Sequence, residues 1–148
     1  MARTEKSVII NRPVDPVFDY ASNFDNLPEW ETSFIEAVKT SEKSKGIGTT
    51  HKGALKLLGM TMDWTSRFTE YEENTRIDVT ITAGKTVLKK QMQFDETHDG
   101  KTEFTLVHEL KVGGFMKLLT PVILLSMRGE MKEHVANLKE IMEREGQG

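Results

Sequence analysis

The sequence predicts an α+β fold in which about seven antiparallel strands pack against one long C-terminal helix, with two short helices after the first strand. Between residues 34 and 112, short segments of alternating apolar and polar residues recur, and turn-forming residues separate them. Connections this short join antiparallel strands, because a parallel crossover needs far more chain. From Phe115 to Glu143 the apolar spacing changes to that of a helix.

Length and composition set the outer limits of the interpretation. The chain has 148 residues, enough for one domain with its own core, so we expect a single domain over residues 1–148. Its net charge of −3 comes from well-mixed acidic and basic residues, which argues against a nucleic-acid partner. There is no cysteine, which excludes disulfides, thiol chemistry and cysteine-ligated metals. The first residues lack the apolar core of a signal peptide, and the longest apolar run, Val122–Leu125, is far too short to span a membrane, so we expect a cytoplasmic location.

Three short elements are expected before the main run of strands. Lys6–Asn11 has the pattern of a strand. Asp15 is expected to cap a short helix whose first residue is Pro16, a position where proline loses no needed hydrogen bond. A second short helix is expected from Asn26 to Trp30.

Six further strands are expected, and alternation places the apolar residues of each on one face. Their bounds are Phe34–Thr40, Thr49–Leu57, Met60–Tyr71, Thr75–Thr82, Thr86–Glu96 and Lys101–Val112. In the last of them, Phe104, Leu106, His108 and Leu110 share one face. Because an antiparallel sheet with one apolar face is covered on that side only, we expect the C-terminal helix to cover it.

The C-terminal helix changes character along its length. The rear half keeps one apolar stripe, made of Leu124, Met127 or Arg128, Met131, Val135, Leu138 and Met142. The front half, Phe115–Leu125, is apolar on nearly all sides, which is more than one sheet contact needs. We therefore expect a cavity wall there, with a subunit contact or a lipid as the alternatives. Thr120-Pro121 leaves two interpretations open: the cap and first turn of a regular helix, or a kink in a helix that begins near Phe115.

Three segments resemble a known superfamily. Ser7–Phe18 looks like its first strand and proline-started helix, Leu27–Trp30 like its second helix, and Phe115–Glu143 like its terminal helix. Together with the order of elements, these segments resemble the START-like superfamily of polyketide cyclases/dehydrases and lipid-transport proteins, which has the helix-grip fold. The resemblance implies a curved sheet gripping the long helix, with an apolar ligand held between them. The superfamily also includes hormone receptors and aromatase/cyclases, so the resemblance alone does not choose an activity.

The residues expected to face such a ligand come from the apolar face of the strands and from the long helix. They are Leu55, Met62, Trp64, Phe68, Val79, Lys90, Met92, Leu106, His108, Leu124, Met127 and Arg128. The methionines suit a tolerant pocket, because their side chains adapt to irregular shapes. Plain core packing is the alternative for each of the apolar residues.

Four polar residues are candidates for specific contacts. His51 and His108 are the candidate catalytic residues, as proton shuttles or by binding a ligand carbonyl, and a satisfied core or rim histidine is the alternative. Lys90 is expected either to bind an acidic head group, such as a fatty-acid carboxylate, or to pack its stem and reach water with its amine. Arg128 is expected either to meet a ligand or a buried carboxylate, or to be a solvated helix charge.

The sequence contains no motif of a known catalytic centre. It lacks a serine-nucleophile elbow, a phosphate loop, a dinucleotide fingerprint and metal-ligand spacing, so no cofactor and no metal are expected. We therefore expect a carrier, sensor or storage protein for a hydrophobic small molecule, lipid-like or polycyclic. The alternatives are a cyclase or dehydratase acting on a polyketide-like substrate, and an interaction module whose apolar helix front contacts a protein or a membrane. A homodimer is left open.

Overall fold

One seven-stranded antiparallel sheet organises the chain, in the order β1-β7-β6-β5-β4-β3-β2. The computed structural model describes residues 2–147. The strands are β1 (Ala2–Ile10), β2 (Phe34–Lys39), β3 (Thr50–Leu57), β4 (Met60–Glu72), β5 (Arg76–Ala83), β6 (Thr86–Glu96) and β7 (Thr102–Lys111). The helices are α1 (Val14–Ser22), η1 (Phe24–Asn26), α2 (Leu27–Trp30), η2 (Gly114–Leu119) and α3 (Thr120–Gln147). The α+β architecture expected from the sequence is therefore confirmed.

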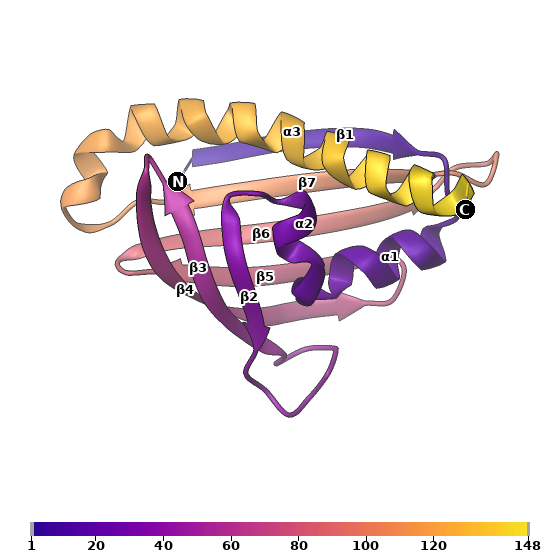
Figure 1. Cartoon of the computed structure of the whole chain (residues 1–148), viewed down its shortest axis with the longest axis horizontal. Helices are drawn as coiled ribbons and strands as arrows, with labels where there is room; N and C mark the ends of the chain where they lie inside the picture. Colours follow the sequence, from indigo (N-terminus) through magenta and orange to yellow (C-terminus); the bar gives the residue numbers. More distant parts are fainter. Residues whose placement is uncertain (1, 148) are drawn as a thin grey trace.

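The sheet is strongly curved, and the helices lie on one of its faces. β2, β3 and β4 turn away from the direction of β5, β6 and β7 (Figure 1). The long helix α3 runs along the sheet beside β1, and the short helices α1 and α2 pack against α3. Gly53 lets the main chains of β3 and β2 approach each other closely, because a Cβ at this position would lie 1.8 Å from the carbonyl oxygen of Glu36 on β2. The β3–β4 turn places both Leu58 and Gly59 at positive φ, as a two-residue hairpin turn requires.

The core lies between the concave face of the sheet and the helices. Alternation identified this face: Ile77, Val79 and Ile81 of β5 are buried, and their neighbours in sequence are more exposed. From α3, the buried stripe is Met131, Val135, Leu138 and Met142. Since each of these is within a few per cent of full burial, the rear half of α3 is held mainly by apolar packing.

Two N-terminal expectations were wrong in detail. α1 begins at Val14, with Pro13 in the cap position and no side-chain cap, so Asp15 does not cap it. Asp15 lies in the first turn instead and accepts a hydrogen bond from the side chain of Asn74. β1 begins at Ala2, four residues before the expected start, because it pairs with β7 along its whole length. Cross-strand pairing thus extends the strand through a polar stretch that the sequence pattern alone does not favour.

The front of the C-terminal helix is where the structure departs most from expectation. Of the two interpretations, the regular helix beginning at Thr120 is the one observed, since Gly114–Leu119 is a 3-10 helix and Pro121 sits in the first turn of α3. Ile123 is buried, but most of the other apolar side chains of this segment face outward. The exposed ones are Phe115, Leu118, Leu119, Val122 and Leu125. Within residues 2–147, no helix is both long and apolar enough to cross a membrane.

Candidate functional site: a pocket between the long helix and the sheet

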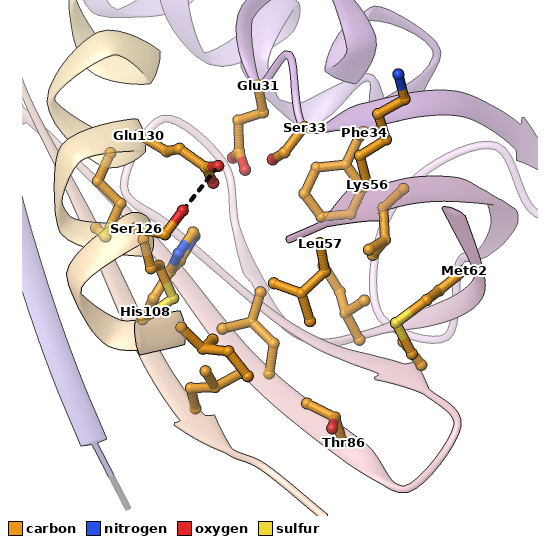
Figure 2. Close-up of a pocket in the computed structure, with 18 of the residues that line it drawn as sticks. Glu31, Ser33, Phe34, Lys56, Leu57, Met62, Thr86, His108, Ser126 and Glu130 are labelled. Atoms are coloured by element: carbon orange, nitrogen blue, oxygen red, sulfur yellow. Dashed lines mark hydrogen bonds between the residues drawn. The ribbon is translucent and has the colours of Figure 1, made fainter. Parts of the chain in front are cut away.

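An apolar pocket lies between α3 and the concave face of the sheet. Its walls come from the connection between α2 and β2, from the start of β2, from the β3–β4 and β5–β6 hairpins, from β7, and from α3. The apolar part of the wall is Phe34, Leu55, Leu57, Met62, Ile81, Ala83, Leu88, Leu110, Ile123, Met127 and Met131. Figure 2 shows these side chains converging from opposite sides on one cavity, with polar groups gathered where Glu31, Ser126 and Glu130 meet.

The cavity is small for the ligand class the sequence suggests. Its volume is about 90 Å³, which is room for several water-sized groups. A bulkier molecule would have to extend through the open side of the pocket or displace side chains. Met62, Met127 and Met131 line the wall, and unbranched methionine side chains can move at low cost.

The structure brings together some of the expected ligand contacts and separates others. Four of them line the pocket: Leu55, Met62, His108 and Met127. Six more are buried in the core without lining it: Trp64, Phe68, Val79, Lys90, Met92 and Leu106. Leu124 and Arg128 are on α3 and also lie outside the wall; Leu124 is half-buried, and Arg128 is exposed. A role in ligand contact stays a prediction for all twelve.

The two candidate catalytic histidines occupy different surroundings. His108 lines the pocket, whereas His51 packs among aromatic rings, with ring centroids 5.3 Å from Phe24 and 5.9 Å from Phe68. Burial lowers the pKa of His51 from its ordinary value, with a smaller opposing effect from Asp25. His51 therefore has the environment of a core histidine, while His108 can touch a bound molecule.

A buried cluster of charged and polar side chains forms the inner end of the pocket. Glu31, at the end of α2, and Lys90, on β6, form an ion pair, and both side chains are 0% exposed. The Lys90 ammonium also lies 3.1 Å from Nε2 of His108 on β7. His134 of α3 completes the cluster, with its Nδ1 3.9 Å from Oε2 of Glu31.

Lys90 is buried and paired, so the alternative in which its amine reaches water is wrong, while its binding of an acidic head group stays a prediction. Its amine does not reach water, and its charge is neutralised by Glu31 before any ligand arrives. The ammonium lies 5.6 Å from the ring centroids of both Trp30 and Phe34, so aromatic faces add to its stabilisation. Burial lowers the pKa of Lys90, while the adjacent Glu31 carboxylate raises it and favours the charged form.

Burial disfavours the charged form of both histidines in the cluster. Burial lowers the pKa of His108 well below its ordinary value, and repulsion from the Lys90 ammonium is a second, smaller cause. Burial also lowers the pKa of His134, and the Glu31 carboxylate only partly opposes this. The cluster thus places the Lys90–Glu31 ion pair beside two imidazoles whose burial disfavours their charged form.

Glu31 and His134 were missed by the sequence reasoning. His134 precedes Val135 on the buried stripe of α3, so helical periodicity could have identified it. Glu31 carried no such signal, because it follows a four-residue helix and its burial depends on Lys90, 59 residues away in the chain. Among the residues that the structure describes, no group of three or more acidic, histidine or cysteine side chains is arranged to hold a metal ion.

An apolar pocket between a long C-terminal helix and a curved antiparallel sheet defines a helix-grip domain. The chain belongs to the family described as polyketide cyclase / dehydrase and lipid transport, whose model matches residues 1–143. No curated protein sequence matches the chain.

Solved structures agree with this fold. The chain is similar to the Zhui aromatase/cyclase from a Streptomyces species, with a TM-score of 0.81, 14% identity, and coverage of 97% of this chain and 94% of the other. It is also similar to the protein TTHA0849 from Thermus thermophilus, with a TM-score of 0.77, 15% identity, and coverage of 94% and 95%. A START superfamily protein from Mycobacterium smegmatis has a TM-score of 0.69, 16% identity, and coverage of 96% and 97%. At these identities the likeness concerns the fold.

Proposed function

We propose that this protein binds a hydrophobic small molecule, lipid-like or polycyclic, in the pocket between α3 and the sheet, as a carrier, sensor or storage protein. The observation that carries the proposal is the continuous apolar wall contributed by every layer of the fold around one open cavity. The family description, which names lipid transport and polyketide chemistry, supports the same class of ligand.

Apolar burial would supply most of the affinity. Each 100 Å² or so of apolar ligand surface removed from water contributes about 2.5 kcal/mol before the costs of association. Since the cavity is about 90 Å³, binding would be accompanied by movement of the methionines or of the front of α3. Ligand binding is therefore expected to change the protection of the front of α3 from hydrogen exchange.

The test is to identify what the purified protein carries and then to block the pocket. Native mass spectrometry and solvent extraction are expected to show a hydrophobic adduct on the wild-type protein. Met127→Trp, which fills the cavity, is expected to abolish the adduct and the uptake of a fluorescent apolar probe. Met60→Trp is the matched control, because Met60 is exposed on the β3–β4 hairpin and does not line the pocket. The proposal fails if the wild-type protein takes up neither, or if both variants behave alike.

The exposed front of the C-terminal segment favours a second function, docking on an anionic lipid surface. Phe115, Leu118 and Leu125 are 80%, 89% and 72% exposed, which is unusual for large apolar side chains. Three segments lie together at this end: the β3–β4 turn, the β5–β6 turn, and the connection from β7 through η2 into α3 (Figure 1). If the apolar surface docks on a bilayer, the entrance of the pocket would face that bilayer, which would be the source of an apolar ligand.

The charge around this surface supports an anionic partner. Residues 56–62, 83–89 and 110–129 contain none of the 23 aspartate and glutamate residues, although the whole chain is acidic. Their charged residues are all basic: Lys56, Lys85, Lys89, Lys111, Lys117 and Arg128. Basic residues near an anionic bilayer contribute about 1 kcal/mol each, and the apolar side chains can insert at the interface.

Sedimentation with vesicles tests this docking. Binding is expected to phosphatidylcholine vesicles that contain phosphatidylserine, to weaken with salt, and to be lost in Leu118→Asp. Val38→Asp, at an exposed apolar position on β2, is the matched control and is expected to bind as the wild type does. If Leu118→Asp instead abolishes a concentration-dependent increase in mass without vesicles, the surface joins two copies of the chain and the lipid proposal is wrong.

A further inference from the structure

We propose that the inner end of the pocket takes a hydroxyl group of an uncharged ligand, which accepts a hydrogen bond from His108 and donates one to Glu31. This inference rests on the proposed binding function and narrows its ligand class. It makes Glu31 and His108 the residues that orient a hydroxylated apolar molecule, such as a phenol, an enol or a polycyclic alcohol.

The first step is that three polar atoms at this end of the pocket lack hydrogen-bond partners within the part of the chain that the structure describes: Oε2 of Glu31, Nδ1 of His108 and Nδ1 of His134, which lies 3.9 Å from that Glu31 oxygen. Oε1 of Glu31 is used by Lys90, but Oε2 is buried and has no hydrogen-bond partner within the part of the chain that the structure describes. The same holds for Nδ1 of His108, whose other ring nitrogen is used by Lys90. Both residues line the cavity, and Figure 2 shows them facing it from different elements. Buried polar atoms of this kind normally bind water or a ligand.

The second step assigns a donor and an acceptor. An ammonium has only donors, so Lys90 donates to Nε2 of His108. A neutral imidazole that accepts at Nε2 carries its hydrogen on Nδ1, and burial keeps His108 neutral by lowering its pKa. The partnerless Nδ1 is therefore a donor, while the partnerless carboxylate oxygen of Glu31 is an acceptor.

The third step compares chemical groups that could reach these two atoms. A hydroxyl both accepts and donates, so it satisfies His108 and Glu31 together. A ketone only accepts and leaves Glu31 unsatisfied, whereas an ammonium only donates and leaves His108 unsatisfied. A carboxylate is worse, because it accepts only and approaches the Glu31 carboxylate, and Lys90 is already neutralised. His134 lies close enough to Glu31 to contribute a further polar contact to the same group.

The ion pair between Lys90 and Glu31 then holds the two binding groups, His108 and the free oxygen of Glu31, in place. The ion pair fixes the tautomer of His108 and the position of the Glu31 carboxylate, and neither group has room to turn toward solvent, since both are fully buried. Because leaving a buried donor or acceptor unpaired costs about 1–3 kcal/mol, the preference for a hydroxylated ligand over its methyl analogue is expected to be about 5- to 150-fold.

The experiment compares three naphthalene probes that differ in one substituent: naphthol, methylnaphthalene and naphthoate. Calorimetry on the wild-type protein is expected to give the order naphthol, then methylnaphthalene, then naphthoate. His108→Phe is expected to remove the preference for naphthol and to leave the affinity for methylnaphthalene nearly unchanged. His51→Phe is the matched control, because it makes the same substitution at a buried histidine outside the pocket.

The outcomes separate this inference from the broader proposal. Equal affinity for naphthol and methylnaphthalene overturns the hydroxyl site while apolar binding stands, and tighter binding of naphthoate overturns it too. Failure of all three probes to bind counts against the proposed function itself. Nitrogen NMR of the wild-type protein provides a second measurement if His108→Phe does not fold: naphthol, unlike methylnaphthalene, is expected to shift the Nδ1 resonance of His108, and an unchanged resonance overturns the assignment.

Discussion

Replacing Lys90 by methionine tests whether the buried ion pair holds the inner end of the pocket together. Methionine keeps an unbranched side chain of similar length but removes the ammonium. The carboxylate of Glu31 is then fully buried without its cation, since its side chain is 0% exposed. Breaking a buried pair from one side is expected to lower the free energy of unfolding by about 3–5 kcal/mol. That is a large fraction of the roughly 5–15 kcal/mol that stabilises a typical domain.

The double variant distinguishes an unpaired charge from lost packing. When Glu31→Met is added to Lys90→Met, no buried charge remains, and similar volumes fill the site. The double variant is therefore expected to be more stable than either single variant, because apolar replacement of a whole buried pair is often neutral. Lys89→Met is the control on the same strand. Its side chain is exposed, so a change within about 0.5 kcal/mol is expected.

Urea unfolding followed by tryptophan fluorescence is a suitable assay, because both Trp30 and Trp64 are buried. With a slope of about 2 kcal/mol per M, a loss of about 4 kcal/mol moves the midpoint down by about 2 M. The reasoning is refuted if Lys90→Met costs less than about 1 kcal/mol. It is equally refuted if the losses of the two single variants simply add in the double variant.

Three further predictions concern stability. Gly129→Ala is expected to raise the free energy of unfolding by about 0.5–1 kcal/mol, since a Cβ there meets nothing within 4 Å and alanine favours the helix; a lower thermal midpoint would contradict this. Gly53→Ala is expected to destabilise β2 and β3 strongly, because the new Cβ would lie 1.8 Å from a main-chain oxygen, and hydrogen exchange should show the loss in these strands first. The free energy of unfolding is expected to fall as the pH drops below about 6.5, by up to about 1.4 kcal/mol per pH unit for each buried histidine. Burial lowers the pKa of these histidines in the folded protein, so the unfolded chain binds protons at a higher pH than the folded protein does. The histidines concerned are His51, His108 and His134, and urea midpoints that do not change between about pH 5.5 and pH 7.5 would contradict this.

Much of the fold followed from local patterns in the sequence. The bounds of β6 were predicted to the residue, and those of β3, β4 and β5 within one residue at each end, because alternation with period two and short turns mark hairpin strands clearly. The N-terminal part was less accurate. The start of β1 depends on pairing with β7, about 100 residues away in sequence, and no local pattern reports that pairing.

The site was only partly predictable for the same physical reason. Alternation placed Leu55, Met62 and His108 on the correct face, but it could not separate the pocket wall from the core beneath it. Trp64 and Phe68 share that face with Met62, yet the curvature of the sheet and the covering helices bury them away from the cavity. A face is a property of one strand, whereas a cavity depends on the gap between several elements.

The sequence by itself determined the class of this protein: one antiparallel sheet, one apolar face and one long helix to cover it. Those features depend on residues close together in the chain, where periodicity and turn chemistry act. Only the tertiary structure decided that Lys90 is neutralised by Glu31, that His108 faces the pocket with a free ring nitrogen, and that the front of α3 turns most of its apolar side chains outward. Each of these depends on groups brought together from distant parts of the chain, and the strength of a buried charge or hydrogen bond is set by those neighbours.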